Sequence, residues 1–401
     1  MVKKNYFLKK IWLFVFTSLF LALPTFGQGV FSGYAGAAGS LQNGTGEKKV
    51  VANLDAFFAG QFNFGSIFQF RTVASLKTLN LTKQFLFTDI ESLVSIDEIS
   101  LAATFHGGDL THHIALFGGE YESIGSDVFL QRHFGIAPIA SRITGTWKGL
   151  MGSVMYPRKN MGLSYTMRFS QPHAVSTYMY LNQAVDLSQL NFDLRYAGLF
   201  KYATIDLAAG LNIPFENQES NGDKVILLVR HVDMHASGTM LFKTGRYFSL
   251  FLQAGINRLR FNPEEGDKML KLEDVHFLFE PRFDFGAISM DISLFNMPKT
   301  FTEDTFFIDY PFGFNLAIYK ENISVGSSVF TAGSHITLSV IDKDLATLKG
   351  IKFSDVSLMF SPFFEVGLSR GVLKIAGKID LLQIVSEHQN ICLNIGYTVQ
   401  L

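Results

Sequence analysis

A strict two-residue alternation at the end of the chain constrains its fold more than any other feature. Between Ile391 and Leu401 every odd-numbered position is apolar, and every even-numbered position is small or polar. Successive side chains of a β-strand point to opposite faces, so this period predicts a strand with one apolar and one hydrated face. The pattern recurs along most of the chain, which predicts an all-β protein.

Charged residues keep to one face in five further alternating windows. The windows are 190–200, 203–213, 248–257, 275–285 and 373–381. An Arg or Lys facing lipid near the bilayer midplane would cost ~2–4 kcal/mol, so this segregation is what a membrane wall requires. Together with 48% hydrophobic and only 17% charged residues, the pattern predicts a transmembrane antiparallel up-and-down β-barrel, apolar outside and hydrated inside.

The amino terminus has the layout of a secretory signal. Lysines at positions 3, 4, 9 and 10 precede an apolar run, Ile11–Leu23, and small residues follow at Thr25 and Gly27. We therefore expect a signal peptide over 1–27 and a single barrel domain over 28–401, with an uncleaved anchor as the alternative. Cys392 is the single cysteine, so no internal disulfide is expected.

The final strand resembles the C-terminal strand of bacterial outer-membrane β-barrel proteins of the porin-like kind. The resemblance rests on Tyr397, on the alternating apolar residues and on the apolar end of the chain; Leu401 departs from the usual terminal Phe. It implies export to the outer membrane, contact with outer-membrane lipid, and recognition of Ile391 to Leu401 by the barrel-assembly machinery.

The number of alternating segments predicts a large barrel. About 13 strands follow Met161, and five candidates precede it: 30–39, 50–60, 62–75, 93–105 and 111–118. This gives about 18 strands, with 16 as the alternative. Short and long connections alternate, with Lys320–Asn322 expected as a tight turn and Pro214–Lys224 as a long loop.

One segment, 119–160, breaks the strand rhythm. It is rich in Gly and holds Arg132, Arg142 and Arg158 among other charges, with poor alternation. Two interpretations stay open. The segment is either a long loop that folds into the lumen and narrows it, or two further strands joined by ordinary loops.

A barrel of this size leaves an aqueous channel, so the sequence predicts a porin-like channel for passive or substrate-selective diffusion of small solutes. The alternative is a surface protein that acts as an adhesin through its extracellular loops. The candidate lumen-lining residues are Asp193, Arg195, Asp206, His231, Asp233, His235, Glu280, Arg282, Asp284, Lys374, Lys378 and Asp380. Their mixed signs do not predict a charge selectivity.

Other classes of function have little support in the sequence. His231, Asp233 and His235 share one face of a strand and are legitimate metal ligands, but such groups also suit a polar lumen, and no metal or other cofactor is expected. Ser164, Ser170, His173 and Ser176 lie close in sequence without the spacing of a hydrolase, so no enzyme is expected. No basic patch with interleaved aromatic residues indicates nucleic-acid binding.

Overall fold

The strands of the protein form one closed antiparallel sheet. The computed structural model describes residues 29–43, 50–78, 81, 92–136, 139–144, 156–183, 188–220, 223–229, 232–261, 263, 268–298, 305–326, 328–341, 347–348, 350–382 and 391–401. The predicted signal peptide lies outside these residues. No helix in the described part of the chain has the length and apolar character needed to cross a bilayer.

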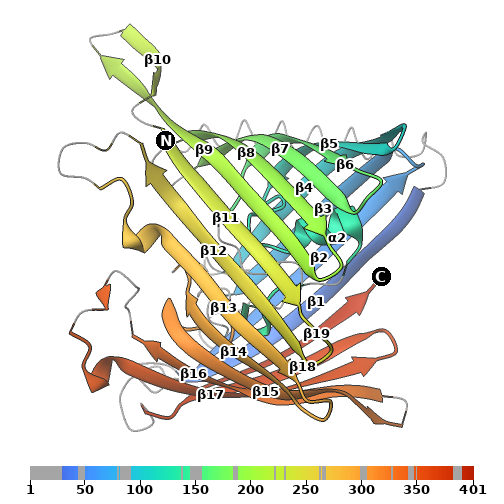
Figure 1. The fold of residues 1–401 in the computed structure, drawn as a ribbon, viewed down its shortest axis with the longest axis vertical. Helices are drawn as coiled ribbons and strands as arrows, with labels where there is room; N and C mark the ends of the chain where they lie inside the picture. The colour runs from blue at the N-terminus through green and yellow to red at the C-terminus, as the bar shows by residue number, and fades with distance from the viewer. Residues whose placement is uncertain are drawn as a thin grey trace.

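The strands follow one another around the wall (Figure 1). The first ten are β1 (Gly29–Asn43), β2 (Val50–Phe64), β3 (Phe68–Thr78), β4 (Ser92–Gly107), β5 (Leu110–Gly119), β6 (Met161–Arg168), β7 (His173–Gln183), β8 (Ser188–Leu199), β9 (Ala203–Ser220) and β10 (Asp223–Val229). The others are β11 (Asp233–Lys243), β12 (Phe248–Arg260), β13 (Val275–Asp284), β14 (Ser289–Asn296), β15 (Phe312–Val325), β16 (Ser328–Val340), β17 (Val356–Leu368), β18 (Gly371–Asp380) and β19 (Ile391–Gln400).

The ends of the sheet meet and close it. β1 pairs with β19 from Tyr34 opposite Gln400 to Gln42 opposite Cys392. β10 pairs only with β9, while β11 also pairs with β9, so the wall contains eighteen of the nineteen strands and β10 forms a hairpin that projects from the rim (Figure 1). The predicted closed barrel and the count of 18 rather than 16 are confirmed.

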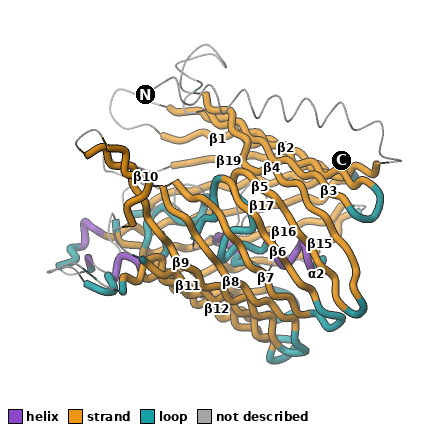
Figure 2. Tube along the Cα trace, turned by 90° about the horizontal axis from the view of Figure 1, so that it is seen from above, coloured by secondary structure: helices purple, strands orange, loops and turns teal. Residues whose placement is uncertain are grey.

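Every second connection is short, and these short connections share one end of the barrel. They span 65–67, 108–109, 169–172, 200–202, 244–247, 285–288, 326–327 and 369–370. The connections at the other end are longer, except 184–187 and the two connections beside β10, 221–222 and 230–232. Figure 2 shows that strands and loops make up most of the described chain and that helices are few and short.

Two predicted connections are wrong in detail. The tight turn expected at Lys320–Asn322 is a bulge inside β15, where the register shifts between Lys320 and Ile323 and Asn322 has φ 55°. The true turn follows at Gly326, whose φ of 61° suits glycine. The long loop expected at Pro214–Lys224 is strand, because β9 continues to Ser220 and turns into β10.

The two faces of the wall differ as the alternation predicts. In β19 Leu393 and Ile395 are 40% and 45% exposed, whereas the intervening Asn394 is 8% exposed. Such exposed apolar side chains recur on strands all around the wall. The outer face is therefore a continuous apolar surface, and the polar side chains face inward.

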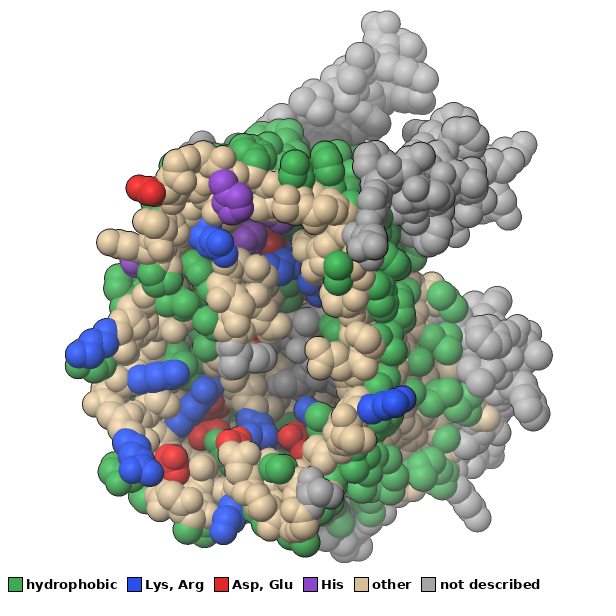
Figure 3. Space-filling view, turned by 90° about the vertical axis from the view of Figure 1, so that its right-hand side faces the viewer, with side chains coloured by type: hydrophobic (Ala, Val, Ile, Leu, Met, Phe, Trp, Pro, Cys, Tyr) green, Lys and Arg blue, Asp and Glu red, His purple; other side chains and the backbone are tan. Residues whose placement is uncertain are grey.

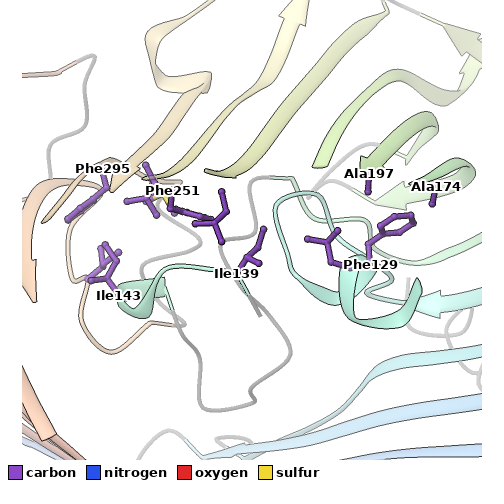
Figure 4. Packing of buried hydrophobic residues seen from close by; sticks show 12 residues of the cluster. Phe129, Ile139, Ile143, Ala174, Ala197, Phe251 and Phe295 are labelled. Carbon is purple, nitrogen blue, oxygen red and sulfur yellow. The ribbon is translucent and has the colours of Figure 1, made fainter. Parts of the chain in front are cut away.

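The chain between β5 and β6 contacts the inner face of the wall. Its described parts, residues 120–136, 139–144 and 156–160, are named the interior segment and include helix α2 (Val128–Phe134) and the 3-10 turn η2 (Arg142–Thr144). Figure 4 shows Phe129 directed toward Ala174 of β7 and Ala197 of β8, and Ile143 near Phe295 of β14. These residues form one buried apolar cluster. No strand occurs in the described part of this segment.

Candidate functional site

Arg158 fastens the interior segment to the wall. The side chain is fully buried; its Nε and Nη2 donate to Oδ2 of Asp193 on β8 at 3.0 and 2.7 Å. Nη1 donates to the carbonyl oxygen of Glu122 at 2.6 Å, and the guanidinium lies 3.6 Å from the ring centroid of Tyr178. One side chain thus joins both limbs of the segment to β7 and β8.

A second buried arginine binds the segment from the wall side. Arg195 of β8 donates Nε and Nη2 to the carboxylate of Asp206 on β9, at 2.8 and 2.5 Å. Its Nη1 donates to the carbonyl oxygen of Glu122 at 2.8 Å, and its guanidinium packs over Phe129. Carbonyl oxygens that a helix or strand would have paired are satisfied here by charged donors.

Carboxylates also bind the two basic side chains of α2, Arg132 and His133. Arg132 donates Nη2 to both carboxylate oxygens of Glu98 on β4, at 2.7 and 2.6 Å. Glu122 accepts from Tyr178 at 2.7 Å and contacts His133 and Arg132. Burial alone would raise the pKa of the Glu122 carboxyl, but His133 and these donors outweigh burial and hold the pKa well below its usual range.

Glu280 and Arg282 of β13 anchor the second half of the segment. Ser141 donates to Glu280, as do Ser293 at 2.6 Å and Arg282 Nε at 2.8 Å. Arg282 Nη2 also donates to the carbonyl oxygens of residues 139 and 140, at 3.3 and 3.2 Å. These two predicted residues therefore contact the interior segment directly.

Of the three residues considered as metal ligands, Asp233 and His235 bind different partners. His231 lies outside the described residues. Asp233 binds Arg260, whose Nε is 3.0 Å from Oδ1. His235 stacks on Tyr156 at 3.9 Å, bonds Asn212 at 2.9 Å and lies 3.1 Å from Asp193 Oδ1. Among the described residues, no three His, Cys, Asp or Glu side chains are grouped so as to hold a metal ion.

The other four predicted residues lie toward β13, β17 and β18. Lys374 pairs with Glu365 at 3.3 Å, and Lys378 pairs with Asp309 of the connection before β15. Asp380 accepts from Ser357 at 2.6 Å. Asp284 is exposed at a short turn, where it accepts from the backbone N–H of Gly286.

A closed eighteen-strand wall, apolar outside and charged inside, with a segment folded into its bore, is now established. The chain is a closed, eighteen-strand antiparallel β-barrel protein. Comparison with protein-family models finds no match, and comparison with curated proteins finds none either. A multiple mutant of the Rhodopseudomonas blastica porin is similar at 8% identity and a TM-score of 0.42, over 93% of this chain and 100% of the porin. Salmonella typhi OmpF in complex with daunomycin is similar at 13% identity and a TM-score of 0.43, over 92% and 97% of the two chains.

The interior segment occupies one side of the bore. Its apolar contacts run from β7 to β14. Beside it, one chamber of about 380 Å³ is lined by residues of β13, β14, β15, β17 and β18, by residues 306 and 307, and by residues 140 and 142 of the segment. A second chamber of about 1200 Å³ is lined mainly by β1, β2 and β17–β19, with Arg71 of β3 and Gln131 of α2. Figure 3 shows a hollow in one face of the molecule with Lys, Arg, Asp and Glu side chains around it.

Four inward acidic residues were absent from the sequence-based candidates: Glu98, Asp291, Glu321 and Glu365. Each lies on the polar face of its strand, so the same alternation could have identified them. Three of them line the first chamber. Three wall carboxylates, Glu98, Glu321 and Asp193, pair with arginines of the interior segment, which are Arg132, Arg142 and Arg158 respectively.

Ser164 and Ser176 lie on the opposite face of the wall from His173, and Ser170 is exposed in the short connection 169–172. Ser164 and Ser176 are fully buried on the inner face, and Ser176 donates to Thr166 at 2.7 Å. His173 instead bonds the hydroxyl of Tyr196 at 2.9 Å and packs against the exposed Phe200. A base on the outer face of the wall cannot activate a nucleophile on the inner face.

Proposed function

We propose that this protein is a bacterial outer-membrane channel for the diffusion of small solutes, rather than an enzyme. The observation that carries the proposal is the uneven filling of the bore: the interior segment is fixed to one side, and charged chambers remain beside it. Ion-paired charged residues suit a hydrated path, because they stay solvated there and would be costly in a dry core. The apolar outer face suits a lipid environment.

Conductance in planar lipid bilayers tests this proposal. We expect the purified, refolded protein to produce stepwise increases in current in potassium chloride solution. The steps should grow in proportion to salt concentration, as expected for a hydrated pore. Heat-modifiable gel mobility of the same sample is the control for a folded barrel. A folded sample that inserts into bilayers without conducting would contradict the channel.

The projecting β9–β10 hairpin favours a second candidate function, that of a surface adhesin. The hairpin extends past the rim at the end that bears the long connections (Figure 1). A two-stranded ribbon outside the wall contributes nothing to closing the barrel. Replacing residues 215–229 by a short turn should leave conductance intact, and loss of cell-surface binding in that variant would favour the adhesin.

A further inference from the structure

The guanidinium of Arg142 occupies a site built by the wall. It lies 4.3 Å from the ring centroid of Tyr319 on β15 and 5.5 Å from that of Phe363 on β17. It pairs with Glu321, and its Nη1 lies 3.9 Å from Glu365. Two aromatic rings and two carboxylates from neighbouring strands therefore surround one side chain of the interior segment.

The charges around the first chamber balance only while Arg142 is present. The wall contributes three carboxylates (Asp291, Glu321 and Glu365) and two cations (Arg282 and Lys374) to its lining. The wall alone therefore carries a net charge of −1 there, and Arg142 brings the sum to zero. Removing that guanidinium would leave an unbalanced carboxylate in the chamber, which favours its replacement by another cation.

Asp291 provides an independent sign that the chamber accepts a donor. It is 4% exposed, lines the chamber and accepts one hydrogen bond, from Tyr319 to Oδ2 at 3.0 Å. Its Oδ1 is buried and has no hydrogen-bond partner among the described residues. A buried carboxylate oxygen is costly to leave unpaired, so this atom is a ready acceptor for a donating ligand.

We propose that this chamber binds small solutes bearing a guanidinium group, which take the place of Arg142 between Tyr319, Phe363, Glu321 and Glu365. The inference rests on the proposed channel function and names the solute class that the channel selects. A guanidinium is planar, stacks on aromatic rings and forms paired hydrogen bonds with carboxylates, whereas an ammonium does neither as well. The guanidinium that enters carries the same single charge as the guanidinium that leaves.

The internal occupant makes the proposal testable, because Arg142 competes with the solute. The apparent affinity of a site falls by the fraction of time that it is free. If Arg142 occupies the site about nine-tenths of the time, Arg142→Ala should raise the affinity for a guanidinium solute roughly tenfold. Glu321→Gln combined with Glu365→Gln should remove most of the binding in either background.

The experiment uses agmatine, a small guanidinium compound, and cadaverine, a diamine of similar length. Titration calorimetry on the detergent-solubilised barrel measures affinity without requiring conduction, and agmatine block of the bilayer current measures it in the open channel. We expect agmatine to bind more tightly to Arg142→Ala than to the unaltered protein, and cadaverine to bind more weakly than agmatine to both.

Arg258→Ala is the matched control. Arg258 is also paired with carboxylates, Glu273 and Asp274, but lies at the rim outside the chamber, so its removal should leave agmatine affinity unchanged. The inference is overturned if agmatine binds Arg142→Ala and the unaltered protein with equal affinity, or if agmatine and cadaverine bind equally well. Neither result would contradict the channel proposal. If calorimetry shows the expected increase in agmatine affinity but the barrel does not conduct, the binding site is supported and only the channel proposal is contradicted.

Discussion

Replacing Arg158 by Ala is expected to loosen the attachment of the interior segment to β7 and β8 and to increase the single-channel conductance severalfold. The buried guanidinium holds Asp193 on one side and the carbonyl oxygen of Glu122 on the other. Removing one partner of a buried ion pair costs about 3–5 kcal/mol, because the other charge stays buried. Asp193 would keep only its contacts with Tyr180 and His235. The lost free energy is that of binding the segment to the wall, and not that of strand pairing. The bore should therefore widen before the barrel unfolds. Bilayer recordings and urea unfolding in lipid vesicles measure the two effects.

Two variants show whether the effect belongs to the pair. Arg158→Ala combined with Asp193→Asn should be less damaging to stability than the sum of the single changes, because no buried charge is left alone. Arg258→Ala, which breaks an ion pair exposed to solvent, should change stability by about 0–1 kcal/mol and leave conductance as it was. Unchanged conductance in a folded Arg158→Ala barrel would show that the segment does not restrict the bore.

The wall could be predicted from the sequence because a membrane barrel imposes one rule on every strand. A residue such as Leu393 must tolerate lipid, and its neighbour Asn394 must not face it, so the alternation is written into each strand. The rule stops where the strands extend beyond the apolar band of the wall. β9 continues past Pro214 with backbone pairing that needs no alternation, and the polar Lys320–Asn322 stretch of β15 has the composition of a turn.

Inside the barrel, the sequence predicts which wall side chains face the bore, but it does not predict what those side chains contact. The inward direction of Asp193 and Glu280 follows from strand period, but their partners do not. Arg158 is separated from Asp193 by 35 residues and Ser141 from Glu280 by 139. Contacts across the bore are set by how the long connection between β5 and β6 folds back, and they leave no periodic pattern in the sequence. For this reason the sequence showed that 119–160 is exceptional without choosing between a loop and two strands.

Leu194→Arg is expected to destabilise the barrel in lipid by about 2–4 kcal/mol, because it places a charge on the outer face near the middle of β8. Leu194 is 57% exposed and lies between Asp193 and Arg195, which point into the bore. In a membrane this exposed surface meets acyl chains, where a guanidinium loses its hydration. In a water-soluble barrel the same substitution would place the charge in water at almost no cost. Urea unfolding in phospholipid vesicles measures the difference.

Tyr247→Arg is the control that separates the effect of depth in the membrane from the effect of side-chain exposure. Tyr247 is 62% exposed, close to the value for Leu194, but it lies in the short turn between β11 and β12. Near the interface the cost of Arg falls to about 0–1 kcal/mol. A wall that crosses a bilayer should therefore lose much unfolding free energy on Leu194→Arg and little on Tyr247→Arg. Equal small penalties at both positions would mean that the apolar outer face does not meet lipid, and the channel proposal would lose its setting.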